Sequence, residues 1–323
     1  HIDNQEITEA SYPPVLDVGV APGLFHRRRT WWAKDSQTAY FVDMDHGEKR
    51  ARVVAFDTHS GGTQILFEET SDTYIDLSFL NEDICSFIPL PDSEELIWWS
   101  ERSGWAHLYL YDLKTGALKR TLTEGNWLVR EIIGTDIERR DVYFQAAGRV
   151  DDRDPYYCEI CRVHIDSDEL TVLASSNHNY VIHKPGTMFI DTMGMYGRDV
   201  SESSGLAPNG NYFVATRSRV NDIPVSELRD RQGNIIMRLE VADVSCILND
   251  WQWPEPVKLL AADGETDIYG VVFRPTDFDP NKEYPVIDYV QGNSAASNVP
   301  KSAFCSDISS ATAYFTSAAW AEL

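Results

Sequence analysis

The sequence predicts a mostly-β protein in which one small antiparallel sheet is repeated along the chain. Three observations predict this fold class. Strand-favouring aromatic residues are abundant, with 15 Tyr, 13 Phe and 9 Trp among 323 residues. No segment before residue 300 has a long apolar period of 3.6 residues, so helices should be few. Turn residues recur between short apolar runs, as at Gly61-Gly62, Thr115-Gly116, Asn209-Gly210 and Gln232-Gly233.

Four copies of one strand pattern follow each other between residues 35 and 239. Their spacing is roughly 45–70 residues, and the lower end matches a four-stranded propeller blade. Stacking blades in a ring buries sheet faces that a single blade leaves open, so we expect a β-propeller with four or five blades between residues 25 and 250. The expected strands are 40–42, 52–57 and 65–67; 96–99, 107–112 and 118–122; 142–144, 156–163 and 170–173; and 212–214 and 235–239.

The C-terminal part of the chain has a different pattern. Residues 257–261 and 267–273 predict an antiparallel pair around the turn Asp263-Gly264. Residues 284–290 predict a buried strand, and residues 306–323 predict a helix. We therefore expect an incomplete propeller over residues 1–250 and the truncated beginning of a second domain over residues 251–323.

The charge balance restricts the partners of the protein. Lys and Arg number 28 against 51 Asp and Glu, which gives a formal net charge of −23. Such a surface repels phosphate, so nucleic acid is not an expected partner. No apolar run reaches the about 18 residues that a membrane-spanning helix needs. The chain begins at His1 without a signal pattern, and we expect any signal or anchor to lie upstream.

The cysteines and histidines do not predict a metal site. Five cysteines are an odd number, which argues against a complete disulfide framework. Cys158 and Cys161 lie three apart in an expected strand, so their side chains should point to opposite faces. His178 and His183 are five apart, and His107 lies in another expected strand, which is not metal-ligand spacing. We expect structural cysteines and no cofactor.

Residues 99–112 read W-S-E-R-S-G-W-A-H-L-Y-L-Y-D, and they are the first of three motifs that carry a family resemblance. This motif resembles a blade signature in the propeller of the prolyl oligopeptidase family, dipeptidyl peptidase IV branch. Residues 206–240 resemble its last blade, and residues 253–292 resemble the start of its α/β-hydrolase domain, with the elements D-G-x-T, P-x-x-F-D-P and Y-P-V-I. The resemblance implies a partial propeller followed by a hydrolase segment that ends before the nucleophile.

The resemblance also implies an activity for the parent protein. Members are serine exopeptidases that remove dipeptides from a free peptide N-terminus, often after proline, with a Ser–Asp–His triad. The chain has no G-x-S-x-G elbow. Ser294 in Gly292–Ala296 comes nearest, but the resemblance places its strand before the elbow strand, so we do not expect it to be the nucleophile. We expect an inactive fragment whose propeller gates access and binds peptide, in a bacterial periplasmic or secreted enzyme.

One active-site residue falls inside the chain by resemblance. In the family, a Tyr after the Y-P-V-I strand helps to form the oxyanion hole, and Tyr289 is the corresponding residue here. It stands one position early, and Asn293 occupies a place where the family has Pro. A shift of one residue in a strand turns a side chain to the other face. An oxyanion-hole donor and an aromatic packed beneath the sheet are therefore both open interpretations.

The acidic pairs have a predicted role as surface charge. The family binds the substrate ammonium group with two Glu in a D-W-x-Y-E-E segment, which is not present here. Glu68-Glu69 and Glu94-Glu95 stand in other contexts and predict solvated charge at blade edges. Within the blade signature, a structural corner with a buried Trp and an Arg–Glu contact is expected from Glu101, Arg102, Trp105 and His107.

Two other functions remain open from the sequence. A non-catalytic propeller for binding or assembly is favoured by the altered segment Tyr289–Asn293. A propeller glycosidase with paired carboxylates ranks last, because residues 250–292 have no place in that architecture. An incomplete ring would expose an apolar blade face, which favours a homodimer or aggregation.

Overall fold

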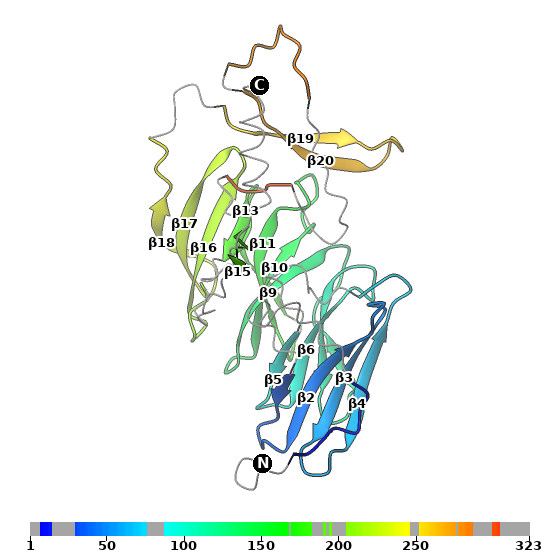
Figure 1. Cartoon of the computed structure of the whole chain (residues 1–323). Coiled ribbons are helices and arrows are strands. Elements are labelled where there is room, and N and C mark those ends of the chain that lie inside the picture. The colour runs from blue at the N-terminus through cyan, green and yellow to red at the C-terminus, as the bar shows by residue number, and fades with distance from the viewer. Residues whose placement is uncertain are drawn as a thin grey trace. The chain divides into compact units, whose positions relative to one another are not determined.

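The computed structural model describes residues 7–14, 30–75, 87–167, 169–182, 190–191, 194–195, 205–245, 252–275, 277–286 and 299–303. These residues contain strands and turns and no helix (Figure 1). Chain contacts divide the protein into two compact units. The first comprises His1–Ala146, Arg162–Thr171 and Met195–Asp199, and the second comprises Ala147–Cys161, Val172–Gly194 and Val200–Leu323.

Four antiparallel sheets of four strands each account for most of the described chain. Three are simple meanders, in which each strand pairs with its neighbour in sequence. The fourth has the order β13-β16-β17-β18, because the two-residue strands β14 and β15 pair separately with each other. The bounds are β1 Thr30–Trp32, β2 Thr38–Met44, β3 Arg50–Asp57, β4 Thr63–Thr70; β5 Phe87–Leu90, β6 Glu95–Ser100, β7 His107–Asp112, β8 Leu118–Thr121; β9 Leu128–Asp136, β10 Asp141–Ala147, β11 Cys158–His164, β12 Leu170–Ala174; β13 Asn179–Ile182, β14 Ile190–Asp191, β15 Gly194–Met195, β16 Tyr212–Arg219, β17 Asp222–Asp230 and β18 Ile235–Val241.

The four sheets confirm the mostly-β fold class of a propeller fragment and the four sequence copies. The predicted strands correspond to the second, third and fourth strands of each sheet, except that β17 was not predicted. The first strand of every sheet, namely β1, β5, β9 and β13, was also not predicted. The repeat was therefore recognised from three of the four strands in the first three sheets and from two of the four strands in the fourth.

The C-terminal prediction is confirmed for the hairpin and wrong for residues 284–286, the beginning of the strand that was expected to follow. Strands β19 (Glu255–Leu260) and β20 (Asp267–Val272) pair around Asp263, whose carboxylate accepts the N–H groups of the two residues that close the turn. Residues 284–286 form no strand, and Val286 is 89% exposed, so the expected buried strand does not begin there. The remainder of that expected strand and the helix predicted at 306–323 lie outside the described residues.

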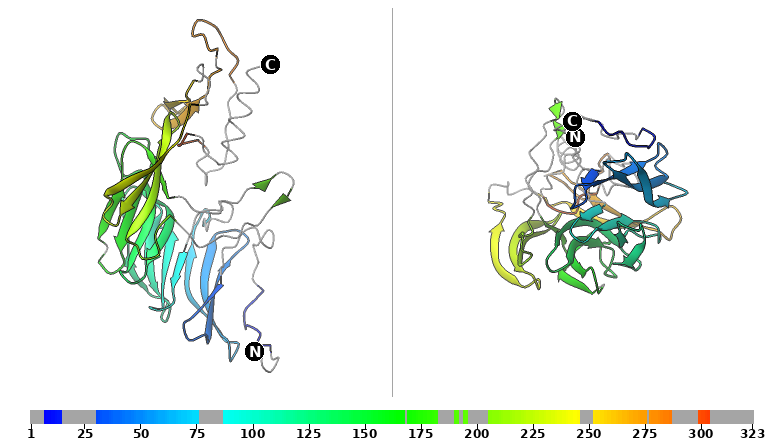
Figure 2. Two further views of the ribbon diagram at one scale, coloured as in Figure 1. Left: turned by 90° about the vertical axis from the view of Figure 1, so that its left-hand side faces the viewer. Right: turned by 90° about the horizontal axis from the view of Figure 1, so that it is seen from below.

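The first two sheets share one hydrophobic core within the first unit. Alternation in β2 directs Tyr40, Val42 and Met44 to the same face, where they meet Trp98 and Tyr109 of the second sheet. Aromatic contacts join the sheets, because the ring of Phe67 on β4 stacks on Tyr111 at 3.8 Å. Figure 2 shows these sheets side by side, β1–β4 in blue and β5–β8 in cyan.

A repeated turn brings neighbouring sheets into close contact. In the turn from β7 to β8, the Asp112 carboxylate accepts two backbone N–H groups, and the N–H of Gly116 donates to the Asp112 carbonyl. Gly116 has φ +72°, and a Cβ there would lie 1.9 Å from the carbonyl oxygen of Leu66 on β4. Gly233, after β17, has φ +87°, and a Cβ there would lie 2.2 Å from the carbonyl oxygen of Leu173. Only glycine satisfies both the backbone angle and the close approach.

Replacing Gly116 with Ala should destabilise the protein more than the backbone angle alone explains. The new methyl group meets the Leu66 carbonyl oxygen in a left-handed conformation, with an expected cost of about 2–4 kcal/mol. Gly264→Ala is the matched control, since Gly264 has φ +73° and no described atom lies within 4 Å of its Cβ position. That control should lose about 1–2 kcal/mol. Urea unfolding followed by Trp fluorescence measures both, and equal losses would contradict the close approach.

Candidate functional site

Two residues of the sequence were weighed for a catalytic role, and neither lies among the residues that the structure describes. Tyr289, the predicted oxyanion-hole donor, and Ser294 both lie in 287–298, outside the described residues. Their roles therefore stay predictions. The described chain does contain the blade signature and the acidic pairs in the first unit, and the loops that receive residues 299–303 in the second unit.

The blade signature is organised around one largely buried carboxylate. Glu69, near the end of β4, accepts hydrogen bonds from Trp98 Nε1 at 2.7 Å, Ser100 Oγ at 2.5 Å and Arg102 Nη2 at 2.5 Å. The guanidinium of Arg102 lies 4.4 Å from the ring centre of Tyr109. Charge-assisted hydrogen bonds to a buried carboxylate fix geometry strongly, so this cluster joins the first sheet to the second.

The acidic pairs correct the sequence prediction in part. Glu68 and Glu94 make partly exposed ion pairs at sheet edges, as expected for surface charge. Glu69 is only 10% exposed, and Glu95 is 2% exposed and bonded to Arg140 at 2.9 Å. Both were expected to be solvated, and that was wrong. Adjacent residues of a strand point to opposite faces, so Glu68 faces out while Glu69 faces the second sheet.

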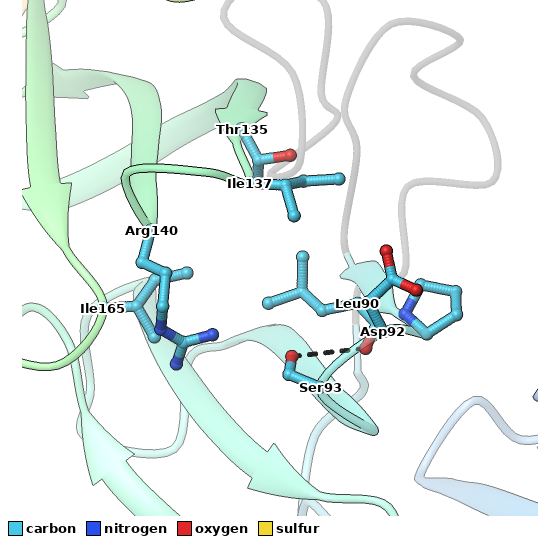
Figure 3. Close-up of a pocket in the computed structure, with 8 residues that line it drawn as sticks. Leu90, Asp92, Ser93, Thr135, Ile137, Arg140 and Ile165 are labelled. Atoms are coloured by element: carbon cyan, nitrogen blue, oxygen red, sulfur yellow. Dashed lines mark hydrogen bonds between the residues drawn. The ribbon is translucent and has the colours of Figure 1, made fainter. Parts of the chain in front are cut away.

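A cavity of about 220 Å³ lies beside Arg140 in the first unit (Figure 3). Both charged residues in its wall are already paired. Arg140 donates to Glu95 and makes two bonds to Asp166, at 2.6 and 2.8 Å, and Asp92 pairs with Lys34 at 2.7 Å. No charge is therefore left to bind a ligand, and we assign the cavity no role. It is lined by Leu90, Pro91, Asp92, Ser93, Thr135, Ile137, Arg140 and Ile165.

The cysteine pair and the signature histidine have structural environments. Cys158 and Cys161 are buried thiols of β11 that form no disulfide, and burial raises the pKa of Cys161 to about 12, so its thiol stays protonated at neutral pH. His107 is buried, with its ring nitrogens bonded to Thr123 Oγ1 and the carbonyl of Gly125, and burial lowers its pKa.

The described residues contain no group of three or more His, Cys, Asp or Glu that could hold a metal ion. They also contain no helix of the length and apolarity that crossing a membrane requires.

The signature tryptophan differs from its prediction. Trp105 was expected to be the buried Trp of the corner, and it is exposed. Trp98 and Trp99 are the buried ones, and Trp99 Nε1 donates to the carbonyl of Val129 at 2.8 Å. The expected Arg–Glu contact exists, but Glu69 supplies the carboxylate from another sheet. The structural interpretation of this motif is thus confirmed with a different partner.

Loops at one end of β11, β13 and β16 form a platform in the second unit. The loop platform comprises residues 153–158, 175–179 and 218–222. Its loops are joined by hydrogen bonds, for example from Cys158 N to Asn179 Oδ1 at 2.9 Å. Residues 299–303 lie on it: Asn179 Nδ2 donates to Ser302 Oγ at 3.2 Å, and Ala303 N donates to the buried Ser218 Oγ at 3.0 Å. The platform therefore holds a part of the chain that follows the sheets.

One polar chain in the platform resembles a catalytic triad in its contacts. Ser176 Oγ lies 2.8 Å from His178 Nδ1, and His178 Nε2 lies 2.8 Å from Asp222 Oδ2. Arg217 Nη1 also lies 3.3 Å from His178 Nε2, so this ring nitrogen is shared between the carboxylate of Asp222 and a guanidinium group. Ser176 Oγ is also 3.1 Å from Tyr180 OH. We assign these contacts to joining the platform loops.

Removing the charge of Glu69 should lower the free energy of unfolding far more than removing the charge of its neighbour Glu68. Glu69→Gln replaces one acceptor oxygen by an NH₂ group among three donors and leaves Arg102 without its carboxylate, with an expected loss of about 2–4 kcal/mol of unfolding free energy. Glu68→Gln is the control, because Glu68 is 39% exposed and should lose under about 1 kcal/mol. Chemical unfolding of both variants decides, and similar small losses would show that the cluster adds no stability.

Comparison with known proteins gives consistent matches. The family described as "Dipeptidyl peptidase IV (DPP IV) N-terminal region" matches residues 26–197. The probable dipeptidyl peptidase 4 of Aspergillus flavus is 25% identical over 277 residues, covering 84% of this chain and 32% of that protein. The probable dipeptidyl peptidase 4 of Emericella nidulans is 26% identical over 281 residues, covering 84% and 33%.

Two solved structures have the same fold in the matched part. The crystal structure of a putative dipeptidyl aminopeptidase IV from Bacteroides ovatus matches with a TM-score of 0.63 and 23% identity, over 85% of this chain and 37% of that chain. The Porphyromonas gingivalis dipeptidyl peptidase 4 structure matches with a TM-score of 0.58 and 17% identity, over 79% and 32%.

The chain spans about a third of the length of the curated relatives it matches. The family match covers more than half of the 323 residues, and it includes the blade signature at 99–112. The chain therefore belongs to the dipeptidyl peptidase IV branch of the prolyl oligopeptidase family, in the region that forms the N-terminal β-sheets.

Proposed function

We propose that the chain is part of a serine peptidase that removes dipeptides from the free N-terminus of peptides, often after proline. The observation that carries the proposal is the family match over residues 26–197. The curated relatives named above are called dipeptidyl peptidases, and the described sheets have the blade pattern expected of the substrate-gating propeller. The partner is then a peptide, with the propeller controlling its access.

We further propose that residues 251–323 begin the α/β-hydrolase domain of this peptidase. The β19–β20 hairpin around Asp263 agrees with the D-G-x-T element of that domain, and residues 299–303 are seated on the loop platform. Tyr289 would donate a hydrogen bond to the tetrahedral oxyanion. The nucleophile, its orienting Asp and its His would come from sequence outside these 323 residues, so this chain alone should not hydrolyse peptides. A homodimer and a periplasmic or secreted location stay predictions.

The complete protein encoded by the open reading frame should hydrolyse glycyl-prolyl p-nitroanilide. An N-acetylated analogue should be resistant, because the family selects a free ammonium group. Tyr289→Phe should lower kcat about 10²–10³-fold if the hydroxyl is an oxyanion-hole donor. A chromogenic assay measures all three.

Two serine variants provide the controls for this assay. Ser294→Ala and Ser176→Ala should both leave kcat unchanged, since neither serine is expected to be the nucleophile. Hydrolysis by the 323-residue chain that Ser294→Ala abolishes would overturn the assignment of the catalytic residues. An inactive complete protein would instead favour a propeller that binds and does not cut.

A further inference from the structure

Lys301 makes an unusually enclosed ion pair on the loop platform. Its Nζ lies 2.7 Å from Asp154 Oδ2, and the two side chains are only 10% and 14% exposed. The ammonium also lies 4.8 Å from the ring centre of Tyr156 and 5.6 Å from that of Tyr269. One carboxylate and two aromatic faces therefore surround one cation, which is the arrangement that attracts an ammonium group most strongly.

Burying this lysine has a free-energy cost that its partners must offset. Burial lowers the pKa of Lys301, while the hydrogen bond to Asp154 raises it. A lysine side chain is long and flexible, and it normally keeps its ammonium group in water. A lysine that is enclosed by specific partners holds those partners in place, because separating them leaves a buried charge unpaired.

The partners of Lys301 come from three separate parts of the second unit. Asp154 and Tyr156 belong to the loop between β10 and β11. Tyr269 belongs to β20, and its ring meets Tyr156 edge-to-face, with centroids 6.0 Å apart and planes at 72°. Lys301 itself lies in 299–303, whose next two residues bond to Asn179 and Ser218 of the platform. A single ammonium group thus joins a sheet loop, the β19–β20 hairpin and the segment after residue 298.

Lys258 provides a contrast at the same Tyr269 ring. Its Nζ lies 5.7 Å from the ring centre of Tyr269 and 2.8 Å from Asp267 Oδ2. These side chains are 56% and 42% exposed, and all three residues belong to the β19–β20 hairpin. An exposed pair of this kind contributes little and connects no separate parts of the chain.

We propose that Lys301 is a positioning residue: through Asp154, Tyr156 and Tyr269 it fixes the β19–β20 hairpin and residues 299–303 to the loop platform. The first part of this inference concerns only the described residues. The second part, that this attachment orients the peptidase segment for catalysis, rests on the proposed function. Residues 299–303 follow Tyr289 closely in the sequence, so their attachment limits where the oxyanion-hole segment can go.

The attachment can be tested in this 323-residue chain without any activity. Hydrogen exchange should be measured for the amides of β19, β20 and residues 301–303. Lys301→Met keeps the apolar stem and removes the charge, and it should raise exchange of these amides at least about tenfold by weakening local closure. Lys258→Met should leave exchange unchanged. Unchanged exchange in a folded Lys301→Met chain would overturn the proposal.

Asp154→Asn keeps the test decisive if Lys301→Met does not fold. It retains the shape of the partner and removes its charge, and it should raise exchange of the same amides. Where Lys301→Met does fold, the effects in the double variant Lys301→Met with Asp154→Asn should be less than additive, because each removes the same ion pair. Strictly additive effects would mean that the two residues act independently, which would also overturn the proposal.

The catalytic part is tested in the complete protein with glycyl-prolyl p-nitroanilide. Misplacing a reacting group lowers kcat, so Lys301→Met should reduce kcat about ten- to a hundredfold with KM within about twofold. Lys301→Arg should recover most of the loss, and Lys258→Met should not change kcat. A lower thermal midpoint with unchanged kcat would assign Lys301 a purely structural role and overturn this part. An inactive wild-type protein would refute the proposed function, while hydrogen exchange would still decide the attachment.

Discussion

The packing of one sheet against the next is the constraint on which the rest of this structure depends. A four-stranded sheet has two faces and cannot bury both by itself. The chain meets this need by bringing an outer-strand carbonyl directly over a glycine turn of the following sheet, at Leu66 over Gly116 and at Leu173 over Gly233. Such close approach leaves no room for a side chain, so the turn sequence determines how near two sheets can lie. The Glu69 cluster then adds charged hydrogen bonds across the same contact.

An equivalent glycine turn in the first sheet explains the position of residues 7–14. Gly61, in the turn from β3 to β4, has φ +74°, and a Cβ there would lie 2.5 Å from the carbonyl oxygen of Glu9. Ser11 N also donates to the Gly61 carbonyl at 2.8 Å. The carbonyl of Glu9 thus lies over the glycine turn of the first sheet, as the carbonyl of Leu66 lies over the glycine turn of the second. A short segment without strand structure takes the place of an outer strand here, because its carbonyl oxygen meets the glycine turn at close range.

The sequence predicted the repeat well because its inner strands are apolar and its turns contain glycine. It missed the first strand of each sheet, as in β5, where Pro89 interrupts a short run that is only partly buried. It missed β17, whose residues alternate between buried and half-buried and include the ion-paired Glu227 and Arg229. Glu69 and Glu95 were misjudged for a related reason: burial of a charge depends on partners from other strands, and no local pattern encodes them. Lys301 was not predicted as a functional residue, since its partners lie 32 to 147 positions away in the chain.

The strand β18 is the outer strand of the fourth sheet, the position from which the first sheet packs against the second. Ile235, Met237, Leu239 and Val241 are all exposed in the described structure, and two register shifts against β17 interrupt the regular alternation of faces along β18. In the first sheet, the equivalent outer strand β4 turns Phe67 into the core that it shares with the next sheet. Exposed apolar side chains on an outer strand therefore have the character of a surface that receives a neighbour. Residues 299–303 attach differently, through the ion pair of Lys301 and one hydrogen bond from the Ala303 N–H to Ser218 Oγ. These contacts are directional, whereas the sheets pack through apolar area.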